Sequence, residues 1–150
     1  VGGKTHHNDE WVHYASGMVF DNVRLVDRIS TFELSRQSPG YVEGNPQSTR
    51  DSLIRMADYG YQLTAVFHSH PGRGRNANLP SNIDIDHQGR LELGGYRALS
   101  GIFSRDGYVR CFTLAFPFTI EIYGHGVEQI DASNFLLTEI SDSLRRRPAA

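Results

Sequence analysis

Two histidines, His68 and His70, flank one serine in the segment FHSHP, and Pro71 follows them directly. Ser81 and Asp84 come ten and thirteen residues after that proline. On a strand, side chains two residues apart point to the same face, so the two imidazoles would converge. Imidazole nitrogens and carboxylate oxygens bind Zn²⁺ at about 2.0–2.2 Å, and three protein ligands leave one tetrahedral position for water, as in catalytic sites. The spacing therefore predicts a zinc site made by His68, His70 and Asp84.

Each half of this pattern also has a purely structural interpretation. An H-x-H pair on a strand is often two partly exposed histidines without a metal. The Ser81-x-x-Asp84 half fits a helix capping box in which Asp replaces Glu. The occurrence of both halves within eighteen residues favours the metal site.

A strand and a helix must position these ligands. The apolar segment YQLTAVFH at 61–68 predicts a central strand of a sheet. Pro71 then ends the strand, because it has no N–H for the ladder, and leaves the histidines at a sheet edge. Ser81 predicts the N-cap of a helix of about three turns that ends near Gly94–Gly95. The Gly/Arg/Asn-rich loop at 71–80 is expected to be flexible.

The remaining segments predict an α/β (α+β) fold with a single mixed β-sheet flanked by helices. The turns are expected at Asp21–Asn22 and Arg105–Gly107, and 33–46 is expected to be a loop. Further strands are expected at 10–20, 23–29, 96–104, 107–116 and 118–124, and further helices at 46–60 and 131–147, the last capped by Asp131 or Ser133.

Length and composition predict one soluble domain over residues 1–150. Residues 1–9 are expected to be a loose lead-in, and because the chain starts at Val1 we expect further residues before it. A net charge of −2 disfavours a nucleic-acid surface. No apolar run reaches the ~18 residues of a membrane helix, and no signal peptide is visible. The single cysteine, Cys111, is expected to be a buried, inert thiol, and indicates a reducing, cytoplasmic location.

The segments HSHP and PSNID resemble the motif of the JAMM (MPN+, JAB-domain) metalloproteases, which combines a Glu with H-[S/T]-H-P and S-x-x-D. The similarity in the order of elements covers about residues 10–125. It implies the JAMM/MPN, cytidine-deaminase-like fold and a zinc isopeptidase that removes ubiquitin or ubiquitin-like modifiers. The chain looks most similar to the compact prokaryotic members. Some of these accompany ubiquitin-like conjugation genes in bacterial antiphage operons, and others trim sulfur-carrier proteins.

The resemblance also implies the roles of further residues. Glu10 stands seven residues before Gly17, similar to the family's E-x₆-G arrangement, and would be the general base. Glu33 and Glu43 are the alternative bases. By resemblance, the Ser81 hydroxyl would donate to the developing oxyanion.

Three basic groups near the ligands stay open to two interpretations. Arg73 and Arg75, in the loop, could meet acidic groups of the modifier or its target, or could only keep the loop soluble. His87 lies three residues after Asp84 and could orient that carboxylate, or could have a surface or core role. The resemblance also implies a partner, a ubiquitin-like protein whose C-terminal tail, often Gly-Gly, would add as a strand beside the site.

Two features depart from the family pattern. Only nine residues precede Glu10, where family members carry a helix, and the loop between Pro71 and Ser81 is longer than in most members. Two other functions remain as alternatives: a non-catalytic MPN-type scaffold and a RadC-like domain linked to DNA. The complete ligand set disfavours the first and the net charge of −2 disfavours the second. No oligomeric state is predicted.

Overall fold

The computed structural model describes residues 11–30, 34–38, 41–44, 50, 54, 58 and 60–138, with the backbone alone for 30, 34–38 and 41–44. The helix α2 spans Asn82–Leu93. The strands are β1 (Val12–Gly17), β2 (Val19–Phe20), β3 (Val23–Arg24), β4 (Arg28–Ser30), β5 (Leu34–Ser38), β6 (Tyr41–Gly44), β7 (Gln62–Ser69), β8 (Leu99–Phe103), β9 (Tyr108–Phe112), β10 (Val127–Gln129) and β11 (Asn134–Leu137).

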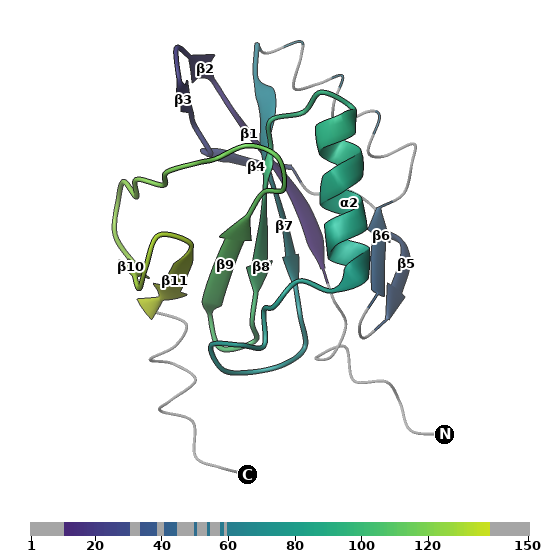
Figure 1. Ribbon diagram of the computed structural model, residues 1–150, viewed down its shortest axis with the longest axis vertical. Coiled ribbons are helices and arrows are strands. Elements are labelled where there is room, and N and C mark those ends of the chain that lie inside the picture. Colours follow the sequence, from purple (N-terminus) through teal and green to yellow (C-terminus); the bar gives the residue numbers. More distant parts are fainter. Residues whose placement is uncertain are drawn as a thin grey trace.

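Seven of the described strands form one mixed sheet in the order β10-β11-β9-β8-β7-β1-β4 (Figure 1). Strands β7 and β8 are parallel, and every other neighbouring pair in the sheet whose register is given is antiparallel. The predicted mixed α+β class is therefore confirmed. The prediction that 61–68 forms a central strand is also confirmed, because β7 lies between β1 and β8.

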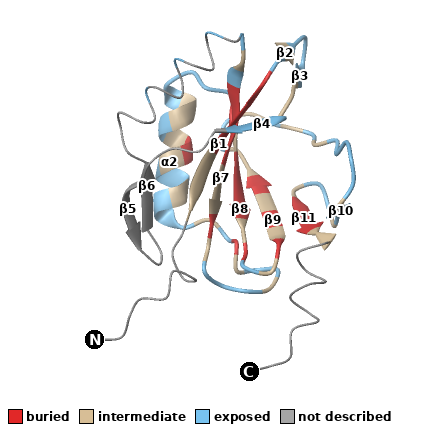
Figure 2. Ribbon diagram, turned by 180° about the vertical axis from the view of Figure 1, so that it is seen from behind, coloured by how far each residue is buried: buried red, intermediate tan, exposed pale blue. Residues whose placement is uncertain are grey.

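Apolar clusters lie on the sheet, and Figure 2 shows the buried residues concentrated on its central strands. The first cluster packs Tyr14 and Val66 against Leu91 of α2. The second packs Val109 and Phe135, from β9 and β11, against residues of the segment that follows β9. Helix α2 is anchored to the start of β8 by the fully buried Gln88. The Gln88 side-chain amide donates to the Ala98 carbonyl (2.9 Å), and the Ser100 hydroxyl donates to the Gln88 amide oxygen (2.6 Å).

The predicted strand at 23–29 is two strands, β3 and β4, separated by three residues. The preceding turn at Asp21–Asn22 is confirmed, and Asp21 takes a positive φ of 52° there. The chain then bends back over Gly17, where an added Cβ would lie 2.1 Å from the Leu25 carbonyl oxygen. Glycine is required at this close approach, which lets β4 pair with β1 as an edge strand.

The prediction of a loop over 33–46 is wrong, because this segment contains the β5–β6 hairpin. The hairpin register pairs Ser38 with Tyr41. The Ser, Pro, Gly and Asn residues of this segment favour a loop, because they are common in turns, but residues 34–38 pair with residues 41–44.

The predicted strand at 118–124 is also wrong. The segment alternates apolar and polar residues, and Phe118 and Ile120 do pack on the core. However, it has no partner in the sheet, since the chain is irregular from Thr113 to Gly126. The alternation thus reflects packing on a sheet face and not membership of the sheet.

The predicted helix at 131–147 begins as a strand. Residues Asn134–Leu137 form β11, which pairs with both β9 and β10. Asp131 does not cap a helix: its carboxylate accepts from the Ser133 and Asn134 N–H groups (both 2.9 Å) in the β10–β11 turn. A short apolar run such as FLL is compatible with the periodicity of a helix and with that of a strand. Pairing with β9 and β10 makes it a strand here. Thr138 is helical, and 139–147 lie outside the described residues.

The predicted helix at 46–60 falls mostly outside the described residues. Arg50, Ile54 and Asp58 are helical and exposed, and Gly60 follows with a φ of 74°. In the part of the chain that the structure describes, no helix combines the length and the apolar character needed to cross a membrane.

Candidate metal centre

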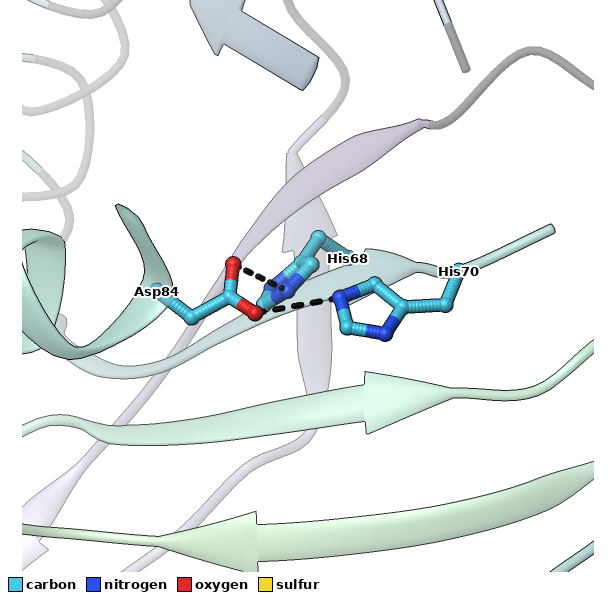
Figure 3. A group of neighbouring side chains, drawn as sticks. All are labelled: His68, His70 and Asp84. Atoms are coloured by element: carbon cyan, nitrogen blue, oxygen red, sulfur yellow. Dashed lines mark hydrogen bonds and ion pairs between the residues drawn. The ribbon is translucent and has the colours of Figure 1, made fainter. Parts of the chain in front are cut away.

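The end of β7 is held by both neighbouring strands, and this fixes the direction of the two histidines. Ser69 exchanges two hydrogen bonds with Trp11: the Trp11 N–H donates to the Ser69 hydroxyl (2.9 Å), and the Ser69 N–H donates to the Trp11 carbonyl (3.0 Å). On the other side, the His70 N–H donates to the Phe103 carbonyl (2.8 Å). His68 and His70 therefore project from one face of the strand end, toward Asp84 (Figure 3).

Asp84 enters the site from the first turn of α2, where it completes the predicted capping box. The Asp84 N–H donates to the Ser81 hydroxyl (3.2 Å), and the Ser81 N–H donates to Asp84 Oδ2 (2.8 Å). The same carboxylate meets both imidazoles, with Oδ1 2.9 Å from His68 Nε2 and Oδ2 3.0 Å from His70 Nε2. The capping and ligand interpretations of Asp84 are thus compatible, and the cap aims the carboxylate.

The donor and acceptor atoms of these three side chains are arranged so that a cation could bind between them. His70 Nδ1 lies 3.1 Å from the Ala77 carbonyl oxygen, which can only accept, so Nδ1 carries the proton. A neutral His70 then turns the Nε2 lone pair toward the Asp84 carboxylate. His68 Nε2 is buried and has no hydrogen bond, although Asp84 Oδ1 is close to it. Lone pairs that face a carboxylate repel it unless a proton or a cation lies between them.

The spacing of the donor atoms is also that of a metal site. One ligand atom from each of His68, His70 and Asp84 can be chosen so that all three lie within 4.8 Å of one another. Ligands about 2.0 Å from a tetrahedral ion lie about 3.3 Å apart, close to the His–Asp separations here. The side chains are 12–15% exposed, so a small ligand can reach a centre that is otherwise shielded. The His68–His70–Asp84 group could therefore hold a metal ion.

The electrostatics of the site favour the ionised form of Asp84 and the neutral form of the neighbouring His87. Burial alone would raise the pKa of Asp84, but the contacts with His68 and His70 and the Ser81 N–H hold it well below its usual range. Burial lowers the pKa of His87, and His68 and Arg90 add to this. Within the described part of the chain no hydrogen bond joins His87 to Asp84, so the predicted orienting role is not seen as a contact.

Hydrogen bonds join the loop at 71–80 to the turn between β8 and β9. The Gly74 N–H donates to both carboxylate oxygens of Asp106 (3.0 and 3.1 Å), and the Arg105 N–H donates to the Gly72 carbonyl (2.8 Å). These bonds fasten the loop to the β8–β9 turn and place the Ala77 carbonyl against His70. The sequence signalled Asp106 only as a turn residue, because nothing in it reveals a partner 32 residues away.

The proposed base and its alternatives cannot be placed. Glu10 and Glu33 lie outside the described residues, and only the backbone of Glu43 is described, in β6. Ser81 is described and exposed. Its hydroxyl oxygen accepts from Asp84, which leaves the O–H proton available to donate.

The two loop arginines differ in their surroundings. Both are exposed, but the Arg75 guanidinium pairs with Asp131 of the β10–β11 turn at 3.0 Å. The charge of Arg75 is therefore already compensated. Of the two, Arg73 is the better candidate to meet an acidic group on another molecule.

Comparison of the chain with models of known protein families gives no match, and comparison with curated proteins gives none either.

Proposed function

We propose that the protein is a zinc-dependent peptidase of the JAMM/MPN type that hydrolyses the amide bond after the C-terminus of a ubiquitin-like protein. The observation that supports this proposal most is the convergence of His68, His70 and Asp84, with the capping box supplied by Ser81. Their order and spacing are those of the resemblance described above. The substrate class comes from that resemblance alone.

A zinc ion bound at this centre would polarise the attacked carbonyl and lower the pKa of a bound water molecule to about 7. The chain supplies the rest. The Ala77 carbonyl holds His70 in the tautomer that presents Nε2, and the α2 cap aims Asp84. The Ser81 O–H would donate to the oxyanion.

Glu10 would take the proton of the attacking water and return it to the leaving amine. Glu10 is covalently adjacent to Trp11, which is bonded to Ser69 between the two histidines. This adjacency to the strand pair that carries the histidines supports Glu10 as the base.

Metal analysis tests the centre. Protein purified without added metal should contain about one zinc per chain, because two imidazoles and a carboxylate suit this ion. The His68→Ala/His70→Ala variant should contain none, and His125→Ala, which changes an exposed histidine outside the site, should keep its zinc. Full zinc in the double variant, or none in the wild type, would exclude the site.

Cleavage tests the substrate. The protein is incubated with a ubiquitin-fold protein from a neighbouring gene that carries a short C-terminal extension, and the products are identified by intact mass. We expect one cut directly after the ubiquitin-fold C-terminus, and none after chelation or in His70→Ala. The fusion could be cut elsewhere, or stay uncut while an unrelated amide is cleaved rapidly. Either result would be compatible with a metal-dependent peptidase but would exclude a ubiquitin-like protein as its substrate.

A further inference from the structure

A pocket of about 310 Å³ lies at the end of β7 away from the metal centre. It is lined by Arg24, Tyr61, Gln62, Leu63, Gly95, Tyr96 and Arg97. Leu63 and His68 are five residues apart on one strand, a separation of about 17 Å. Figure 1 shows the β2–β3 hairpin and the carboxyl end of α2 at this end of the sheet, opposite the loop from β7 to α2. The pocket is thus separate from the proposed catalytic site.

The charges in this pocket are unbalanced. Arg24 and Arg97 both line it, and none of the other lining residues carries a carboxylate. Among the residues that the structure describes, Arg24 Nε is buried and has no hydrogen-bond partner, and Arg24 Nη2 donates a long bond of 3.4 Å to the Gln62 side-chain oxygen. Burial lowers the pKa of Arg24, and the charge of Arg97 lowers it further. An anion bound in the pocket would offset the repulsion between Arg24 and Arg97, and it would accept a hydrogen bond from Arg24 Nε.

The donors and the size of the pocket indicate the class of anion. A guanidinium presents paired N–H groups whose geometry matches phosphate and carboxylate oxygens, and two such forks suit a doubly charged phosphate better than a singly charged carboxylate. The volume is at the lower end for small-molecule sites and exceeds what a bare phosphate needs. Tyr61 and Tyr96 supply aromatic surface for an organic substituent. The Arg28 guanidinium carbon already lies over the Tyr61 ring, 4.8 Å from its centroid. The Tyr96 ring is therefore the more accessible aromatic surface for a ligand.

We propose that this pocket binds the phosphate group of a small ligand, with Arg24 and Arg97 as the paired donors. The phosphate is either free or the head of a phosphomonoester whose organic part lies along Tyr96. The pocket shares no residue with the metal centre, so phosphate binding there does not depend on the proposed peptidase activity.

Titration of the whole chain with phenyl phosphate, inorganic phosphate and benzoate at constant ionic strength tests the site. Binding is followed by the side-chain N–H signals of the arginines in two-dimensional NMR. We expect saturable shifts of the Arg24 and Arg97 signals with both phosphates and a weaker response to benzoate. Tighter binding of phenyl phosphate indicates a phosphomonoester, and equal binding indicates free phosphate. Benzoate binding as tightly as the phosphates overturns the phosphate assignment.

Variants locate the binding. Arg97→Gln changes an exposed residue and should leave the fold intact, while phosphate affinity falls at least about tenfold, as expected for a lost charged hydrogen bond. Arg24→Gln should have a similar effect. Arg90→Gln is the matched control, because Arg90 is exposed on α2 and does not line the pocket. Unchanged affinity in Arg97→Gln, or an equal loss in Arg90→Gln, overturns the site; the zinc content should be unchanged in all three.

Discussion

Asp84 combines a structural and a chemical role in one side chain. Its carboxylate receives the Ser81 N–H and lies within 3.0 Å of both imidazoles. A carboxylate that accepts a helix-cap hydrogen bond loses rotational freedom, so little entropy remains to be lost when a metal binds. The capping box therefore preorganises the centre.

The general base can be identified by an isosteric change. Glu10→Gln retains the shape of the side chain and removes the proton acceptor. We expect zinc content to stay near one per chain while the cleavage rate falls about 10²- to 10⁴-fold. Glu33→Gln and Glu43→Gln, measured in parallel, should cleave normally. Normal cleavage by Glu10→Gln together with a slow Glu33 or Glu43 variant would move the base to that residue.

Two variants of Ser81 separate its cap from its hydroxyl. Ser81→Ala should cost about 1 kcal/mol of stability through the lost N-cap and reduce the cleavage rate about 10²-fold through the lost donor. Asn caps a helix as well as Ser does, so Ser81→Asn should recover the stability in denaturant unfolding but not the rate. Recovery of both would show that Ser81 acts only as a cap.

At the scale of elements, the loop between β7 and α2 belongs to the metal centre. It is fastened to the β8–β9 turn through Gly74 and Asp106, and it supplies the carbonyl that fixes the His70 tautomer. The Ser104 hydroxyl also donates to Asp106 (2.8 Å), so the carboxylate links the turn to the loop.

Loosening this link should weaken the metal centre without touching a ligand. In Asp106→Asn one carboxylate oxygen becomes a donor that faces the Gly74 N–H. We expect zinc to bind up to about tenfold more weakly, at the low end of the effect of losing an outer partner. Competition with a chelator measures the affinity. Glu121→Gln, which changes an exposed carboxylate in the segment after β9, is the control, and equal affinities in both would show that the loop is held by other contacts.

The Arg75–Asp131 pair predicts different roles for the two loop arginines. An exposed ion pair contributes little to stability, so the pair can open when another acidic group competes. Asp131→Asn should free Arg75 and lower KM up to about fivefold, while Arg73→Glu should raise KM with kcat nearly unchanged. Steady-state cleavage of the fusion measures both. A fall in kcat at constant KM would place these residues in the chemical step instead.

At the scale of the molecule, the two proposed sites lie at opposite ends of the strand β7. Helix α2 and the candidate metal ligands meet at one end of β7, and the proposed phosphate pocket lies at the other. Cys111 is 7% exposed in the cluster with Val109 and Phe135, and burial raises the pKa of its thiol to about 12.

This burial predicts how Cys111 responds to pH and to thiol reagents. A folded-state pKa above the ordinary value of 9.0 means that the unfolded state releases its proton first. Stability should therefore be unaffected below pH 9 and fall by about 1.4 kcal/mol per unit as the pH rises toward 12, relative to Cys111→Ala. At pH 8 an aromatic disulfide reagent should react only after denaturant is added. Rapid reaction of the native protein would contradict the buried position.

The amino-acid sequence by itself determined the local parts of the metal centre. The H-x-H spacing placed two imidazoles on one strand face, Ser81 and Asp84 formed the predicted cap, and Gly94 ended the helix where expected. These features depend on backbone geometry over a few residues, which sequence spacing encodes directly.

Only the tertiary structure decided the features that depend on distant partners. Residues 134–137 became a strand because β9 and β10 offered hydrogen bonds, and residues 118–124 remained irregular because no strand did. The hydrogen bonds from Gly74 to Asp106, and the pocket that Arg24 and Arg97 both line, likewise bring together segments that no local pattern connects. Such contacts are selected by the free energy of the whole packed sheet, where burial and pairing outweigh the weak preferences of short segments.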